Sequence, residues 1–177
     1  AALLLEHPVG DAPVPHHEEL GEGRDPPGLR QHEVGAEVEP ELRRLVDGEG
    51  GGRELPDLDH VVDAGSDDEA LSAIRDWIAG HLTYVSGSST IDTTAIDSFI
   101  DRQGVCRDYA HLMITLCRAA QVPARIASVF APGVTPPDFH AVTEVYLDGA
   151  WHLIDATGMA HADQMALIAV GRDALDV

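Results

Sequence analysis

A cysteine stands at the start of an apolar segment, where a helix would give it unusual chemistry. Cys106 comes two residues after Gly104 and opens the stretch 106–121, which is apolar on nearly all sides, as in a buried helix. The first N–H groups of a helix lack partners and carry roughly half a positive charge, which lowers the pKa of a thiol. Arg107 adds positive charge, while Asp108 in the same turn opposes the thiolate. Cys106 is therefore the candidate nucleophile.

The second cysteine, Cys117, has a different setting. It lies about three helical turns further on, among Ile114, Leu116 and Ala120, which is the environment of a small buried hydrophobic residue. Two cysteines make no disulfide framework, and unpaired thiols fit a reducing compartment, so we expect a cytoplasmic protein.

A predicted hairpin supplies a base for the thiol. Two apolar segments, 140–147 and 150–155, flank the dipeptide Asp-Gly at 148–149, which is typical of a two-residue turn. In that register Val142 faces Asp155, and alternation of side chains puts His140 and Asp155 on the same face of the sheet. The two residues lie diagonally, about 7–8 Å apart between Cα atoms, so an imidazole and a carboxylate can meet there.

A cysteine, a histidine and an aspartate in this arrangement carry out thiol acyl transfer. The carboxylate fixes the tautomer and orientation of the histidine ring, which leaves the other ring nitrogen to take the thiol proton. The alternative is that His140 only begins a strand and Asp155 only ends one. Because a helix-start cysteine, a strand-start histidine and an aspartate on the same face coincide, we favour the functional interpretation.

The preceding elements are predicted from caps and periodicity. A helix over 66–82 has Ser66 as N-cap and Glu69 completing a capping box, with one apolar face. A short extended piece and turn follow at 83–89. A second helix then begins at Asp92 or Thr93, and Gly104 ends it. Beyond the cysteine helix, which Pro123 ends, we expect a strand at 124–131 and a Pro/Gly loop at 132–138.

Residues 1–65 have a different composition from the rest of the chain. They hold seven of the eleven prolines and several charge runs, and only 38–46 resembles a short helical turn. Such a segment buries little apolar surface.

The overall charge excludes some functions. The formal net charge is −20, and all eleven basic residues are arginine. Nucleic-acid binding needs a basic surface, so we do not expect it. No apolar run has the roughly 18 residues of a membrane span, and we expect no membrane association.

Other histidines and carboxylates are assigned no catalytic role. His111 lies within the buried helix and His152 on the sheet face opposite Asp155, so both are predicted to be structural. Two acidic and histidine clusters lack the ligand spacing of a metal site, and we expect no metal and no cofactor. These clusters are His16, His17, Glu18 and Glu19, and Asp155, His161 and Asp163.

Residues from about 66 to 177 resemble the bacterial transglutaminase-like family, relatives of the papain-like thiol hydrolases. The matching segments are SFIDRQGVCRDYAHLMITLCRAAQVPAR, PDFHAVTEVYLDGAWHLIDAT and IAVGRDALDV. The resemblance implies an α+β fold, in which the helix with the cysteine packs on an antiparallel sheet that carries the other two residues. It also implies that Cys106 is the nucleophile, His140 the base and later the acid, and Asp155 the orienting residue.

Two departures from the family pattern concern the ends of the chain. Family members often carry an upstream β-rich module, but residues 1–65 show little strand alternation. We therefore expect residues 1–65 to be an acidic N-terminal segment that represents a degenerate or partial form of this module. Residues 66–177 are expected to form the catalytic domain. Relatives usually continue with more sheet after GRDALDV, so we also expect an exposed sheet edge or a partner.

The predicted reaction is hydrolysis or acyl transfer at a peptide or carboxamide bond of a peptide or protein substrate, through a thioester on Cys106. Hydrolysis is favoured because water is always abundant. The backbone N–H of Cys106 meets the oxyanion, with a second donor among Tyr84, Gln103 and Thr94, of which we prefer Tyr84. The alternatives are a non-catalytic binding module that recruits a protein partner, and an assembly role for the acidic N-terminal segment. The oligomeric state stays open.

Overall fold

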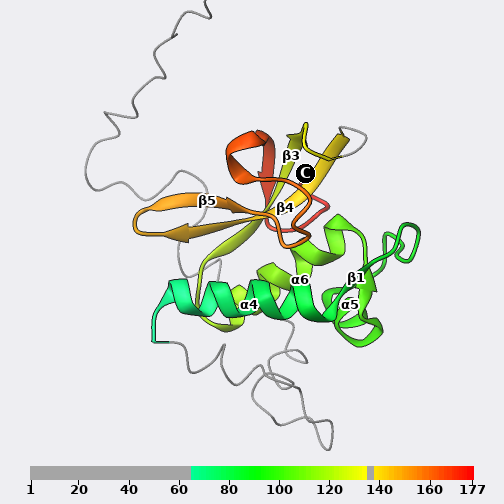
Figure 1. The fold of residues 1–177 in the computed structure, drawn as a ribbon, viewed down its shortest axis with the longest axis horizontal. Helices are drawn as coiled ribbons and strands as arrows, with labels where there is room; N and C mark the ends of the chain where they lie inside the picture. Colours follow the sequence, from blue (N-terminus) through cyan, green and yellow to red (C-terminus); the bar gives the residue numbers. More distant parts are fainter. Residues whose placement is uncertain (1–64, 135–137) are drawn as a thin grey trace, which may run out of the picture.

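A computed structural model describes residues 65–134 and 138–177 (Figure 1), so the segments 1–64 and 135–137, including the helical turn expected at 38–46, lie outside the described residues. In these described ranges, three helices accompany a four-stranded antiparallel sheet of order β5-β4-β3-β6 and a two-stranded parallel ladder, β1-β2. The predicted α+β class is confirmed. The elements are α4 (Asp67–His81), β1 (Thr83–Tyr84), α5 (Ala95–Asp101), β2 (Gln103–Gly104), α6 (Cys106–Ala119), β3 (Ala124–Ala131), β4 (Asp138–Leu147), β5 (Ala150–Ile154), the 3-10 turn η1 (Ala162–Gln164) and β6 (Ala166–Gly171).

Helix α4 begins as its sequence predicts. The hydroxyl of Ser66 accepts a hydrogen bond from the Glu69 N–H at 3.3 Å. The predicted capping box was wrong, because the Glu69 carboxylate accepts from the N–H of Gly65 at 2.9 Å and not from the N–H of the N-cap residue Ser66. The helix buries Ile74, Trp77 and other apolar residues of one face.

The predicted start of α5 was wrong. The helix begins at Ala95 with Thr94 as N-cap, because Thr94 and Asp97 bond reciprocally: each side chain accepts from the backbone N–H of the other. Thr93, one of the two residues we expected there, instead accepts from the N–H of Thr90 at 2.8 Å within the preceding turn.

The predicted end of α5 was also wrong. The helix ends at Asp101, and Arg102 adopts the left-handed conformation with φ 56°. Gly104 lies beyond the helix in β2, where a Cβ atom would stand 2.6 Å from the Cβ of Asp108. Gly104 is required by this close approach and not as a helix terminator.

Helix α6 lies at the centre of the larger core. Its buried side chains, among them Leu112 and Leu116, pack with α4, α5 and one face of the sheet, represented by Ile126 and Val145. Cys117 is fully buried there, as predicted. The opposite face of the sheet has a second, smaller core of Ala127, Val129, Ala131 and Val142, which packs against Val134, Leu153, Ala160 and Met165. The sheet therefore separates two apolar layers.

The β4–β5 hairpin has the predicted register, with Tyr146 opposite Trp151 and Leu147 opposite Ala150. Asp148 and Gly149 have φ of 50° and 84°, as a type I′ turn requires. Pairing ends at Thr143 and Ile154, so β5 does not cover the first half of β4. The first half of β4 therefore has an uncovered edge on its β5 side.

The other margin of the sheet is β6, which pairs with β3 on one side. Within the described ranges no strand pairs with its other side, and Leu167 and Ile168 are exposed there. The expectation of an exposed edge or a partner after residue 177 stays a prediction.

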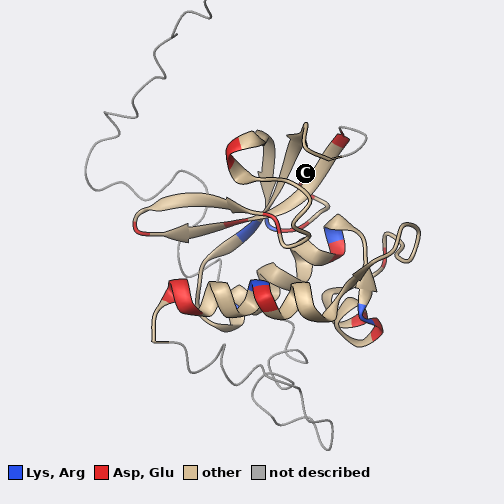
Figure 2. Cartoon of the chain, in the orientation of Figure 1, with Lys and Arg blue, Asp and Glu red and all other residues tan. Residues whose placement is uncertain are grey.

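Charged residues are distributed over the surface. Figure 2 shows acidic positions in red on α4, α5 and the β4–β5 turn, with a few arginine positions in blue. Of the helices in the described residues, none has the length and apolar character needed to cross a membrane.

Candidate active site

The cysteine is held at the first position of α6 by its own turn. The Asp108 carboxylate accepts a hydrogen bond from the Val105 N–H at 2.8 Å and lies 3.1 Å from the Arg107 guanidinium. Asp108 is therefore occupied as a cap and an ion-pair partner. Cys106 is partly exposed at this end of the helix, which is compatible with a reactive thiol.

The uncovered edge of β4 receives the thiol. Odd-numbered residues of β4 direct their N–H groups toward the β5 side, because Leu147 and Ala150 close the two-residue turn. Beyond Thr143 no β5 residue occupies that side, and the N–H of Ala141 hydrogen-bonds to the Cys106 sulfur. The early end of β5 thus opens the position at which the helix start meets the sheet.

The structure brings Cys106, His140 and Asp155 together. The Nε2 atom of His140 lies 3.0 Å from Oδ2 of Asp155, and both side chains are almost completely buried. The His140 ring also hydrogen-bonds to the Cys106 thiol. Since Nε2 faces the carboxylate, Nδ1 is the nitrogen left for the sulfur.

The electrostatics favour a thiolate and an imidazolium. Burial alone would raise the pKa of Cys106, but hydrogen bonds from His140 and the Ala141 N–H outweigh it and hold that pKa below its ordinary value. Burial would likewise lower the pKa of His140, yet the hydrogen bonds to Asp155 and Cys106 raise it to about 9. Each partner stabilises the charged form of the other.

Asp155 is fixed in its ionised form by a turn. Its carboxylate accepts hydrogen bonds from the Thr157 N–H at 2.9 Å, the Thr157 hydroxyl at 2.7 Å and the Ala160 N–H at 2.9 Å. Burial acts against ionisation, but the hydrogen bonds from His140 and Thr157 hold the pKa of Asp155 below its usual range. Gly158, with φ 68°, provides the left-handed position of this turn.

Thr157 is a residue that sequence reasoning did not assign to the site. Its hydroxyl donates to Asp155 and lies 3.3 Å from Nε2 of His140. Because that hydroxyl hydrogen is directed at the carboxylate, the oxygen can only accept from the ring. The sequence signal was present: a threonine two residues after an aspartate is typical of a side-chain turn, and the predicted register already set Thr157 opposite His140.

Tyr84 reaches the start of α6 through the parallel ladder, in which it pairs with Gly104. Its phenol oxygen accepts a hydrogen bond from the Cys106 N–H. Partial burial and the negative charge of the nearby thiolate raise the pKa of Tyr84, so the phenol stays protonated. This hydroxyl is therefore placed beside both the sulfur and the backbone N–H of Cys106.

The other two oxyanion candidates are placed differently. The Thr94 hydroxyl donates to the Asp97 carboxylate at 2.8 Å, where it caps α5. Gln103 is exposed in β2. Tyr84 is the candidate of the three with a contact to Cys106.

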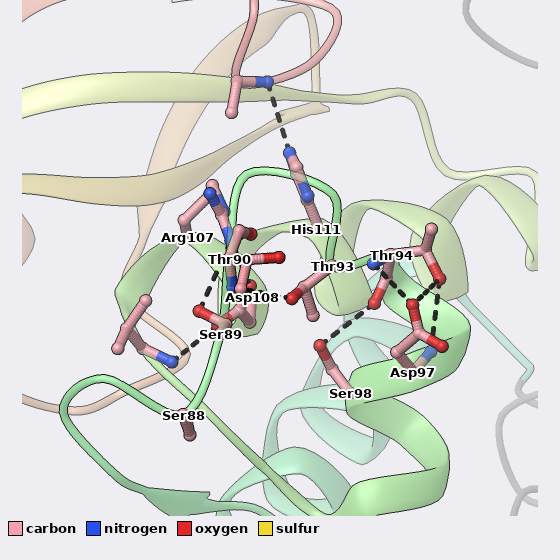
Figure 3. A network of polar contacts seen from close by, with 12 residues as sticks. Ser88, Ser89, Thr90, Thr93, Thr94, Asp97, Ser98, Arg107, Asp108 and His111 are labelled. Carbon is pink, nitrogen blue, oxygen red and sulfur yellow. Dashed lines mark hydrogen bonds and ion pairs between the residues drawn. The ribbon is translucent and has the colours of Figure 1, made fainter.

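A polar network anchors the loop that follows β1. One Arg107 nitrogen donates to the Ser89 hydroxyl, to the Thr90 carbonyl and to Asp108 (Figure 3). His111, also in this view, accepts from the Ala174 N–H at 3.2 Å, and burial lowers its pKa. His111 thus has the structural role expected of it.

The remaining predicted groups are apart from the site. His152 is exposed on β5, on the face away from Asp155. Within residues 65–134 and 138–177 no three His, Cys, Asp or Glu side chains are arranged to hold a metal ion. The cluster at 16–19 lies outside the described residues.

Comparisons with known proteins support the fold. A crystal structure described as "a Putative Cysteine Protease from Cytophaga hutchinsonii" is 40% identical, with a TM-score of 0.65 over 78% of this chain and 44% of that one. The periplasmic domain of TgpA from Pseudomonas aeruginosa shares the fold at 19% identity and a TM-score of 0.55, over 75% of this chain and 50% of that one.

Curated relatives match part of the chain. An uncharacterised protein of Mycobacterium leprae is 26% identical over 62% of this chain and 42% of its own length. Mouse kyphoscoliosis peptidase is 33% identical over 56% of this chain and 17% of its own length. The chain thus spans less than half the length of these relatives.

A family model matches residues 59–156, which include the start of α6, the β4–β5 hairpin and Asp155. The chain belongs to the transglutaminase-like superfamily.

Proposed function

We propose that this protein is a thiol-dependent hydrolase or acyltransferase that acts on peptide or carboxamide bonds through a thioester on Cys106. The observation that carries the proposal is the contact of one helix-start thiol with a buried histidine, which is itself paired to a buried carboxylate at 3.0 Å. The 40% identity to a protein described as a cysteine protease supports the hydrolase class.

The first half of the reaction forms the thioester. The Cys106 thiolate attacks the carbonyl carbon, a C–S bond forms, and the carbonyl electron pair moves to oxygen. The N–H of Cys106 and the hydroxyl of Tyr84, which bond to each other in the free protein, both turn toward this oxyanion. Protonated His140 then gives its proton to the departing nitrogen as the C–N bond breaks.

The second half releases the acyl product and regenerates the Cys106 thiolate. Neutral His140 accepts a proton from water, or from an amine, as that nucleophile attacks the thioester carbon. The C–S bond breaks, and the sulfur leaves as the thiolate beside the newly protonated imidazole. Asp155 keeps the ring oriented in both halves, since it holds Nε2 while Nδ1 exchanges the proton.

The test is to trap the acyl intermediate. The protein is incubated with a library of unblocked peptides, quenched in acid and digested, and the Cys106 peptide is examined by mass spectrometry. An acyl adduct on Cys106, absent from a Cys106→Ala variant and also absent from Cys117, supports the proposal. Substrate cleavage that persists undiminished in Cys106→Ala contradicts it.

Release of ammonia from glutamine peptides, measured with and without a primary amine, separates hydrolysis from transfer. Equal rates and a carboxylate product indicate hydrolysis. A protein that binds peptides but never forms an adduct is the non-catalytic module of the alternative hypothesis.

A further inference from the structure

Two large aromatic side chains of the main sheet are exposed beside the proposed site. Phe130 and Phe139 are directly opposite each other on β3 and β4. Their ring centroids are 6.1 Å apart at 73°, and the two residues are 38% and 67% exposed. An edge-to-face aromatic pair is a common core feature, so such a pair facing water suggests a binding surface.

The pair continues the sheet face on which α6 packs. Ile126 opposite Thr143, and Phe130 opposite Phe139, point to the same side of the sheet, because they are separated by an even number of residues. The Ile126 end belongs to the core under α6. The Phe130 end lies beyond Ala141, whose N–H contacts the first residue of α6, and Phe139 there is exposed.

The distance to the thiol is about two residues of a strand. The N–H of Ala141 bonds to the Cys106 sulfur, and Phe139 comes two residues earlier in β4. At about 3.4 Å per residue this separation is roughly 7 Å along the strand. A substrate acyl group on Cys106, continued in extended form along this edge, places the next residue level with the two rings.

We propose that Phe130 and Phe139 form an apolar subsite, which accepts the large apolar side chain of the substrate residue on the amino side of the acyl residue. This inference rests on the proposed function. It adds the substrate class: peptides with a leucine, phenylalanine or similar residue at that position. An acidic side chain at that position would lose its hydration against the two rings, so we expect it to be disfavoured.

The experiment uses acetyl-X-glycyl chloromethyl ketones in which X is Phe, Leu, Ala or Glu. The Cys106 thiolate displaces chloride, so a C–S bond forms as the C–Cl bond breaks, and no other reactant is needed. We expect the Phe and Leu probes to alkylate Cys106 about tenfold faster than the Ala probe, with the Glu probe slowest. Site-resolved mass spectrometry gives each rate.

Variants locate the preference. Phe139→Ala and Phe130→Ala are expected to reduce the Phe-to-Ala rate ratio to near one, and Phe139→Leu to retain most of it. Leu175→Ala removes an apolar side chain that is 82% exposed and lies outside β3 and β4, and it should leave the ratio unchanged. A wild-type ratio near one, or a ratio that survives both alanine variants, overturns the subsite.

Iodoacetamide, which has no X residue, separates this proposal from the previous one. Its rate at Cys106 should be the same in Phe139→Ala as in the wild type, which also shows that the variant is folded. If iodoacetamide labels wild-type Cys106 no faster than a free cysteine, the activated thiol is contradicted. The ratio of two probe rates does not depend on how reactive Cys106 is. A failure of the subsite proposal can therefore be distinguished from a failure of the activated thiol.

Discussion

Helix α6 carries two cysteines with opposite properties. Cys106 begins the helix and contacts His140, and its pKa lies below the ordinary value. Cys117 lies about three turns later, is fully buried, and burial raises its pKa to about 12. The same side chain in one helix is thus prepared for ionisation at one end and prevented from it at the other. The difference comes from position and partners, and it makes Cys117 an internal reference for every experiment on Cys106.

The largest expected effect comes from removing the imidazole. In His140→Ala the thiolate loses its counter-ion and its proton acceptor, so we expect amide hydrolysis and alkylation of Cys106 near neutral pH to fall by about 100-fold or more. Cys117 should stay unlabelled. Alkylation followed by peptide mapping measures both thiols in one sample. Equal alkylation of Cys106 in the variant and the wild type would show that its reactivity does not depend on His140.

Tyr84→Phe should separate thiolate formation from transition-state stabilisation. The variant loses the proposed oxyanion donor but leaves His140 in place, so we expect hydrolysis to fall by about 100-fold. Iodoacetamide has no carbonyl oxyanion to stabilise, so alkylation of Cys106 should change little. A parallel fall of both rates would indicate that Tyr84 only positions the helix start.

The pH dependence should distinguish the same two reactions. Amide cleavage needs protonated His140, whose pKa is about 9, so its rate should fall roughly tenfold per pH unit above that value. Alkylation needs only the thiolate and should not fall there. Rates between pH 5 and 11, with circular dichroism at each pH, test this expectation. A hydrolysis rate that keeps rising above pH 10 contradicts the role of His140 as acid.

Stability should follow the same ionisations. Because folding raises the pKa of His140, its stabilising contribution is fully present below the unfolded value, about 6.5, and is lost as pH rises through about 9. Because folding lowers the pKa of Asp155, its contribution is present above the unfolded value and is lost as pH falls through the folded one. Denaturant midpoints across pH measure both. Labelling of Cys117 reports the unfolded population independently.

The smallest effect is expected at Thr157. Replacing it by valine removes the hydroxyl that donates to Asp155 and lies beside Nε2 of His140, which should slow hydrolysis about fivefold, as for one hydrogen bond. Because the His140 ring loses this acceptor, the pKa above which the hydrolysis rate falls should also be lower. Thr157→Ser keeps the hydroxyl and should restore both values. A rate loss in valine and serine variants alike, without a shift of the profile, would indicate a packing effect only.

The hairpin and the cysteine helix could be predicted because their signals are local. The Asp-Gly turn fixes the register of the two strands, and that register determines which face His140 and Asp155 share. The boundaries of α5 were harder because three consecutive residues, Asp92, Thr93 and Thr94, are all suitable caps. The choice depended on Asp97, three residues after Thr94.

Features set by tertiary contacts could not be predicted from the sequence. Gly104 suggested a helix terminator, while its actual constraint is the side chain of Asp108. The approach of the thiol to the edge of β4 depends on where β5 stops, and the exposure of Phe139 depends on which elements pack over the end of β4. None of these has a sequence pattern of its own. The division of the chain at residue 65, into an N-terminal segment and a catalytic domain, stays a prediction.

The two-residue ladder of β1 and β2 has a consequence for tolerance to mutation. Gly104 pairs with Tyr84 in this ladder, so its position determines the distance between the Tyr84 phenol and the start of α6. Any methyl group at 104 must displace Asp108, which holds the first turn of α6. We therefore expect a single added carbon to misalign the proposed oxyanion donors while the two apolar layers remain intact, which would leave the protein folded but abolish the proposed activity.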